Sequence, residues 1–167
     1  MSAGATEGLL ARETVRRVQA ALKAAGSAAQ VVALASTART AEDAASSLGV
    51  PVGAIVKSLV FAVDGRPVLA LVAGDRRCRQ DHLAASLGLD GIAARADADL
   101  VRRATGFSIG GVAPLGHPAA LATAIDASLG RFATVYAAAG HPHCVFATSL
   151  DELVRLTGGK LAADLAE

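Results

Sequence analysis

Hydrophobic and polar positions along the chain follow two periods, one typical of helices and one typical of strands. Residues 9–25 place Leu10, Val15, Val18 and Leu22 on one face and basic side chains toward the other. This spacing predicts an amphipathic helix that ends at Gly26. Four shorter helices are predicted in the same way, the first and last beginning with capping-box spacing; they lie at residues 40–49, 79–88, 97–106 and 149–159.

Short apolar, β-rich segments separate these helices. The clearest hairpin joins residues 54–63 to residues 66–74 through Asp64 and Gly65, a pair that favours a tight turn between strands. Further strands are predicted at residues 30–35, 91–96, 121–126, 131–140 and 143–149. Hairpins mixed with helices indicate one α+β domain around a mixed sheet rather than strict βαβ alternation.

Composition narrows the class of protein. The 167 residues suffice for one domain with a sizeable core, and 53% of them are hydrophobic, so disorder is not expected. A net charge of +1 argues against a polybasic grip on long nucleic acid, although a short RNA such as a tRNA end fits. We expect Cys78 and Cys144 to be reduced thiols in a cytoplasmic protein without signal peptide or membrane span.

Lys57 interrupts an otherwise apolar strand. It shares one strand face with Ile55 and Leu59, so it must reach solvent or serve a site. One interpretation is a charged residue that protects an edge strand from aggregation. The other is an ammonium at the rim of a pocket, aimed at a phosphate or an ester carbonyl.

A glycine-rich segment, residues 106–117, is unusually apolar. Its sequence GFSIGGVAPLGH fits neither a Walker loop nor a dinucleotide fingerprint. The glycines could simply serve tight turns. Alternatively, apolar anchors fix the loop while Gly110 and Gly111 expose backbone amides that could hold an anionic oxygen.

Histidines near the C-terminal strands suggest another chemistry. His117, His141 and His143 could bind zinc, but no acidic or cysteine partner stands at familiar spacing, so we predict no metal and no cofactor. A serine-based triad is not expected, because no serine lies in a nucleophile elbow.

Taken together, four segments resemble the YbaK/EbsC family of aminoacyl-tRNA editing domains. They are TAEDAASSLGVPVGAIVKSLVF, PVLALVAGDRR, GFSIGGVAPLGH and YAAAGHPHCVFATSLDELVRLTGG, which follow the family's order. The resemblance covers residues 36–165 and implies a mixed, barrel-like sheet flanked by helices. We therefore expect a single domain over residues 1–167, with an N-terminal helix at about 8–25.

The resemblance also implies a function and a site. Family members hydrolyse mischarged aminoacyl-tRNA, so the expected partners are mischarged tRNA, above all that for proline, and prolyl-tRNA synthetase, with no DNA or membrane. The implied catalytic residues are Lys57, which contacts the terminal adenosine or aminoacyl group, and Gly110, Gly111 and His141 near the ester. The implied substrate-binding residues are Ser58, Phe61, Ile109, Val112, Pro114, Gly116, His117, Gly140 and His143.

One departure bears on the substrate. Where the branch that deacylates Cys-tRNA has a basic stretch followed by an acid, this chain has GHPHCVF, with Val145 at the acidic position. That favours the branches that clear alanine or 2-aminobutyrate. Cys-tRNA or Ser/Thr-tRNA deacylation, a non-catalytic tRNA-binding module, a zinc hydrolase and a purely structural glycine loop are the alternatives.

Overall fold

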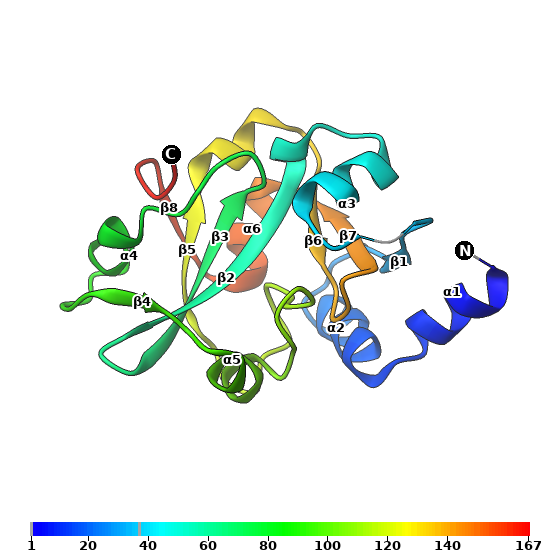
Figure 1. Cartoon of the computed structure of the whole chain (residues 1–167), viewed down its shortest axis with the longest axis horizontal. Helices are drawn as coiled ribbons and strands as arrows, with labels where there is room; N and C mark the ends of the chain where they lie inside the picture. The colour runs from blue at the N-terminus through cyan, green and yellow to red at the C-terminus, as the bar shows by residue number, and fades with distance from the viewer. Residues whose placement is uncertain (1, 37) are drawn as a thin grey trace.

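A computed structural model describes residues 2–36 and 38–167, which fold into one mixed α/β unit (Figure 1). Its α-helices are α1 (Ala3–Leu10), α2 (Glu13–Ala24), α3 (Ala41–Leu48), α4 (Gln80–Ser86), α5 (Ala98–Thr105) and α6 (Leu150–Thr157). The strands are β1 (Val32–Ala33), β2 (Ile55–Val63), β3 (Arg66–Ala73), β4 (Ala93–Arg95), β5 (Ala122–Asp126), β6 (Val135–Ala138), β7 (Cys144–Thr148) and β8 (Lys160–Ala162). Two short 3-10 helices are η1 (Val52–Ala54) and η2 (Ala127–Arg131).

The strands of the described residues form one eight-stranded mixed sheet. Its order is β1-β7-β6-β2-β3-β5-β8, with β4 paired to β2 outside this path. The β2–β3 hairpin is antiparallel, whereas β2 with β6 and β3 with β5 are parallel. The mixed sheet predicted from the sequence is therefore confirmed.

Both faces of the sheet are covered by packed apolar side chains. The larger core cluster joins α2 and α6 to one face, with Val18, Leu22 and Leu153 fully buried. The second cluster places Leu83 of α4 and Leu165 near the C-terminus against the other face. Strand β3 is buried on both faces, which explains its nearly continuous apolar sequence.

Local sequence signals account for most of the elements. Asp64 and Gly65 both have positive φ, 49° and 81°, as the turn of a two-residue hairpin requires. The Thr40 hydroxyl accepts a hydrogen bond from the Asp43 amide, and Ser149 caps α6 through Glu152 in the same way. These predicted helix starts are confirmed.

The N-terminal region differs from its prediction. The single helix expected over residues 9–25 is two helices, because Arg12 has extended backbone angles, φ −61° and ψ 142°. Helix α1 and strand β8 were not predicted, and β1 is only two residues long. Both cysteines are free, and the longest helix of the described residues has 12 residues, too few to cross a bilayer.

Candidate active site

A cavity of about 320 Å³ lies between α3, the middle of β2, the glycine loop and the β6–β7 turn. Its wall is largely apolar, with polar groups from Arg39, Thr40, Lys57, Ser58 and Tyr136. The volume is at the lower end of the range for small-molecule sites. Five sequence-predicted site residues line it: Lys57, Ser58, Ile109, Gly110 and Val112.

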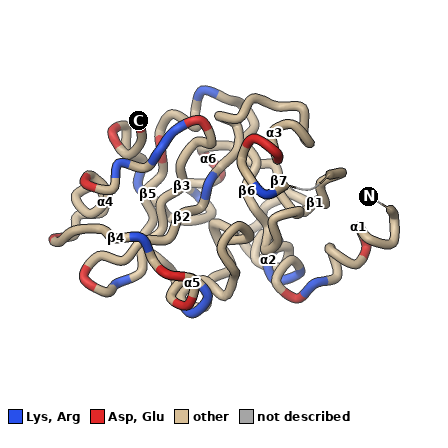
Figure 2. The backbone as a smooth tube through the Cα atoms, in the orientation of Figure 1, with Lys and Arg blue, Asp and Glu red and all other residues tan. Residues whose placement is uncertain are grey.

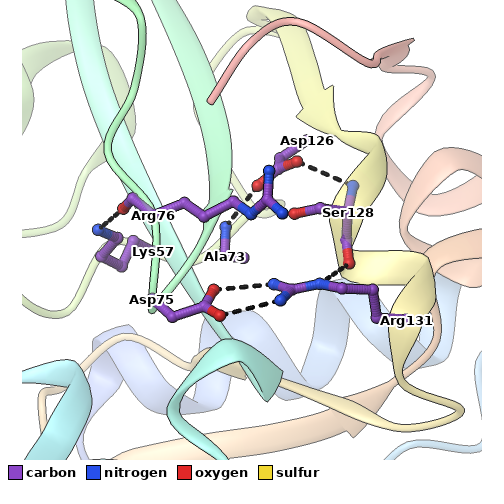
Figure 3. Close-up of polar contacts among 7 residues, drawn as sticks. All are labelled: Lys57, Ala73, Asp75, Arg76, Asp126, Ser128 and Arg131. Atoms are coloured by element: carbon purple, nitrogen blue, oxygen red, sulfur yellow. Dashed lines mark hydrogen bonds and ion pairs between the residues drawn. The ribbon is translucent and has the colours of Figure 1, made fainter. Parts of the chain in front are cut away.

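Lys57 is the half-buried cation of this cavity. Its ammonium donates a hydrogen bond to the Arg76 carbonyl, in the turn that follows β3 (Figure 3). Burial lowers the pKa of Lys57 from its usual value, and the carboxylates of Glu42 and Asp75 oppose that shift. Lys57 therefore lies in the cavity wall, with its ammonium held by a backbone carbonyl.

The edge of β2 is open beside Lys57. Strand β6 pairs with Ile55 and Val56 on this edge, and β4 pairs with the end of the strand from Phe61. Among the described residues, positions 57–60 thus have no strand partner here. The Ile55 carbonyl accepts from the Gly74 amide, on the β3 side, and the Val60 carbonyl accepts from the Ala96 amide, on the other side. Alternation along the strand therefore directs the Ser58 N–H and C=O into the gap.

The Ser58 side chain adds a polar atom to the same place. Its hydroxyl is buried and has no hydrogen-bond partner among the described residues. Ser58 also lines a smaller cavity of about 50 Å³ that shares Leu59, Ile109 and Gly110 with the larger one. A ligand that enters between the two cavities would find unpaired backbone and hydroxyl groups.

The glycine loop contributes unequally through its two central residues. Gly110 has φ 93°, lines both cavities, and its amide has no hydrogen-bond partner among the described residues. The Gly111 amide instead donates to the Ser108 carbonyl, and the Gly111 carbonyl accepts from Gly140. The expectation of two exposed amides therefore holds for Gly110 alone.

The glycine loop has four large apolar side chains that could anchor it, those of Phe107, Ile109, Val112 and Leu115. Three of the four are buried. Phe107, Val112 and Leu115 belong to the larger core cluster. Ile109 is 61% exposed and stands at the cavity mouth, so it does not anchor the loop. Its exposure leaves an apolar side chain available to a ligand.

Helix α2 supports the loop from behind. Arg17 donates a 2.6 Å hydrogen bond to the Gly106 carbonyl, and its guanidinium lies 4.6 Å from the centre of the Phe107 ring. Gly140 approaches the same helix so closely that an added Cβ would lie 2.5 Å from the Thr14 carbonyl oxygen. The loop and the β6–β7 turn are thus fixed on one helix.

His141 and His143 lie beside the cavity rather than in its wall; Pro142 between them lines it. The His141 Nδ1 accepts a 3.0 Å hydrogen bond from the His143 amide, which leaves the proton of neutral His141 on Nε2. Burial first, then Arg12 and His143, lower the pKa of His141. At neutral pH its proton-accepting nitrogen is therefore already engaged.

Other predicted site residues lie outside the cavity. Phe61 is 1% exposed and packs in the second core cluster, at the part of β2 that pairs with β4. Pro114, Gly116 and His117 do not line the cavity. A Cβ added to Gly116 would lie 3.7 Å from Ala21 of α2 and 3.7 Å from the Phe107 ring. The His117 Nε2 lies 2.8 Å from the Ala113 carbonyl. The structure does not bring these residues together with Lys57.

Sequence reasoning missed several cavity residues. Arg39, Thr40 and Ala44 reach the cavity from the start of α3, and Tyr136 reaches it from β6. Thr40 carried a signal only as a helix cap, which does not reveal what lies beside it. Across residues 2–36 and 38–167, no three His, Cys, Asp or Glu side chains are grouped so that they could hold a metal ion.

Comparison with known proteins identifies the family of this chain. The sequence profile described as "Aminoacyl-tRNA editing domain" matches residues 35–156, most of the chain and every wall of the cavity. The chain belongs to the aminoacyl-tRNA editing domain family. The resemblance noted in the sequence is confirmed, and so is the expected fold.

Relatives of this editing domain occur both alone and within synthetases. It is 40% identical over 79 residues to a proline–tRNA ligase of Nitratidesulfovibrio vulgaris, a match covering 47% of this chain and 14% of the ligase. It is 32% identical over 129 residues to the uncharacterised protein YwhH of Bacillus subtilis, covering 77% and 81% of the two chains. The chain thus spans only a small part of the ligases that it matches.

A solved structure extends the likeness over the whole fold. A protein proposed to be a trans-editing enzyme for prolyl-tRNA synthetase superposes with a TM-score of 0.87 and 40% identity, covering 93% of this chain and 98% of the other. In the editing domain described here, basic and acidic segments are interspersed over the surface (Figure 2).

Proposed function

We propose that this editing domain is a trans-editing deacylase that hydrolyses the ester of tRNA for proline carrying alanine or 2-aminobutyrate. The observation that carries the proposal is one small cavity with a half-buried ammonium, that of Lys57, and the unpaired amide of Gly110. Membership of the editing family supplies the substrate class. The likeness to proline–tRNA ligases favours tRNA for proline and a prolyl-tRNA synthetase as its source.

The chain's own groups suffice for the reaction. An aminoacyl ester is reactive, so a positioned water can attack its carbonyl without a protein nucleophile. In this mechanism the Lys57 ammonium holds the terminal adenosine, and the Gly110 amide donates to the oxygen that becomes negative. The ester C–O bond then breaks, and the ribose oxygen leaves with a proton.

Proton transfer is assigned to the ribose hydroxyl beside the ester rather than to His141. The Nδ1 of His141 is occupied by the His143 amide, and the side chain does not line the cavity. His141 and His143 act instead by shaping the turn that places Pro142 in the wall. Substituting His141 is therefore expected to have a smaller effect on the rate than substituting Lys57.

Cavity size supplies the specificity. A synthetase site built for proline excludes smaller amino acids weakly, because a missing methylene changes binding by only ~1–3 kcal/mol. A second, smaller hydrolytic site corrects this when it admits the small acyl group and excludes the proline ring. The cavity wall includes the apolar side chains of Val56, Val112 and Ala138, which suit a small apolar acyl group.

The test is a panel of tRNA for proline charged separately with alanine, 2-aminobutyrate, cysteine, serine and proline. Release of alanine or 2-aminobutyrate, with proline spared, is the expected result. Fast release of cysteine or serine alone would contradict the assigned substrate but keep the reaction. Binding of tRNA without release of any acyl group would instead indicate a non-catalytic module.

A further inference from the structure

The carbonyl that holds Lys57 belongs to a short connection, residues 74–76, between β3 and the segment leading to α4. The Arg76 carbonyl accepts the hydrogen bond from the Lys57 ammonium (Figure 3). Lys57 is on β2, so its ammonium is placed by a residue 19 positions away in sequence. The position of this connection therefore decides where the cation lies.

Both sides of Gly74 are tied to the end of β5 and to η2, which follows it. On one side, the Ala73 amide donates to Asp126 Oδ2 at 3.0 Å, and Asp126 is 1% exposed. On the other side, Asp75 forms a bidentate pair with the Arg131 guanidinium, with N–O distances of 2.8 and 2.9 Å (Figure 3). The connection cannot shift without breaking one of these bonds.

The partner side of this pair is itself fixed. Arg131 Nε donates to the Ser128 carbonyl at 2.7 Å, and the Ser128 amide donates to Asp126 Oδ1 at 2.9 Å. The guanidinium also lies 5.1 Å from the centre of the Phe132 ring. Arg131 thus presents its two outer nitrogens in one orientation, which a planar guanidinium can do and an ammonium cannot.

Close packing removes the remaining freedom. A Cβ added to Gly74 would lie 2.3 Å from the Val52 carbonyl oxygen, so the connection lies directly against η1. A Cβ on Gly53 would lie 2.9 Å from both the Asp75 carboxylate and the Phe132 ring. Backbone, carboxylate and ring therefore meet without spare volume.

We propose that the Asp75–Arg131 ion pair is a positioning device: it fixes the Arg76 carbonyl and thereby holds the Lys57 ammonium at the cavity. An ordinary surface ion pair stabilises a protein by about 1 kcal/mol or less and positions nothing. Here the carboxylate of the pair belongs to Asp75, the neighbour of Arg76. The Arg76 carbonyl in turn accepts the hydrogen bond from the Lys57 ammonium. The effect on deacylation rests on the proposed function, whereas the placement of Lys57 does not.

The charged surroundings of Lys57 are few enough to be separated by experiment. Glu42 approaches it from α3, Arg95 from β4, Asp75 from the connection and Cys78 from the segment leading to α4. Arg131→Gln leaves all four of these groups in place and removes only the partner of Asp75. A change at Lys57 in this variant would therefore report position rather than a deleted neighbouring charge.

The chain contains three lysines, Lys23, Lys57 and Lys160, so lysine labelled with ¹³C at Cε gives a simple NMR spectrum. Lys57→Arg assigns its signal. We expect Arg131→Gln and Asp75→Asn to move the Lys57 signal and its titration while those of Lys23 and Lys160 stay in place. Arg131→Lys should have a smaller effect, and it keeps the test usable if Arg131→Gln unfolds.

Deacylation kinetics provide the second arm. The expected result is a fall of kcat/KM by ~10-fold or more in Arg131→Gln, mainly through kcat, because a displaced catalytic group loses rate steeply. Asp99→Asn, which breaks the exposed Arg103–Asp99 pair on α5, is the matched control and should leave both readouts unchanged.

An unmoved Lys57 signal in Arg131→Gln would overturn the proposal. So would a moved signal with unchanged kcat/KM, or an equal loss in the Asp99→Asn control. If the wild-type chain releases no acyl group, the proposed function fails and the NMR arm alone decides whether the pair places Lys57.

Discussion

Gly110 and Gly111 are neighbours in sequence, yet each backbone has a different role. Gly110 turns with φ 93° and leaves its amide unpaired among the described residues, at the cavity. Gly111 uses its amide within the turn and packs against His141, where an added Cβ would lie 3.0 Å from the backbone. The Gly110 amide is therefore available to a ligand in the cavity, whereas Gly111 packs the loop against the β6–β7 turn.

Gly110→Ala tests this difference at a single residue. Alanine at positive φ costs about 1–2 kcal/mol, and the strain would displace the Gly110 amide. We expect a modest loss in the free energy of unfolding and a fall in deacylation rate of ~10-fold or more. Gly49→Ala, at φ 69° in open space after α3, should lose similar stability and keep its activity. Equal rates in the two variants would contradict the role of Gly110.

Lys57 also links the site to stability through its pKa. Burial lowers that pKa in the folded chain, so at pH values between the lowered and the usual pKa the unfolded chain binds more protons. The contribution of Lys57 to the free energy of unfolding consequently rises with pH between these two pKa values. We expect urea unfolding at neutral and alkaline pH to show wild type gaining stability relative to Lys57→Met as pH rises. A constant difference between the two proteins would show that the cation is not buried.

Helix α3 forms part of the cavity wall through its first turn. Its cap residue Thr40 lines the cavity and bonds to the Asp43 amide at 3.1 Å. Thr40→Ala should lower the free energy of unfolding by about 1 kcal/mol and raise KM, because the first turn of α3 loosens beside the substrate. Ser149→Ala removes the cap of α6, which is no part of the cavity, and should lower stability alone. An unchanged KM in Thr40→Ala would contradict this role of α3.

Helix α2 acts on the site through Arg17. Its bond to Gly106 and its stacking on Phe107 connect the helix to the start of the glycine loop. Arg17→Ala should lower the free energy of unfolding by about 1–2 kcal/mol and reduce deacylation as the loop becomes mobile. Arg16→Ala, an exposed neighbour on the same helix, serves as the control in urea unfolding and activity assays. Equal effects of both substitutions would refute the contact's role.

These elements also show what the sequence could and could not predict. Caps such as Thr40 and the Asp64–Gly65 turn are local, so their residues alone identified them. The open edge of β2 is not local, because it exists only where β6 ends and β4 begins. Arg39 and Tyr136 likewise became site residues only when distant segments met at the cavity. Phe61, which the resemblance implied as a substrate-binding residue, lies in the second core cluster, because a resemblance assigns a role without showing which side chains cover a position.

The folded unit of the whole molecule begins earlier in the chain than the family profile does. The profile begins at residue 35, yet α2 lies before it and places Val15, Val18 and Leu22 in the larger core cluster. Burying three such side chains contributes roughly 5–8 kcal/mol. The described fold therefore depends on a helix that the family match does not include.

Truncation separates the two N-terminal helices. Helix α1 buries only Leu9, so a chain that lacks residues 1–7 should unfold near the wild-type urea midpoint and remain active. A chain that begins after Ala24 should fail to fold cooperatively, as circular dichroism and urea unfolding would show. A stable, active protein without α2 would contradict its structural role.

The proposed deacylation depends on Lys57, whose ammonium the Arg76 carbonyl holds at the cavity. The most direct measurement is the single-turnover rate of alanine and 2-aminobutyrate release from tRNA for proline by wild type, Lys57→Ala and Lys23→Ala. Lys23 is an exposed lysine on α2 and controls for loss of charge alone. We expect Lys57→Ala to fall to the rate without protein while Lys23→Ala matches wild type. Release by Lys57→Ala at the wild-type rate would contradict the role of Lys57 in deacylation.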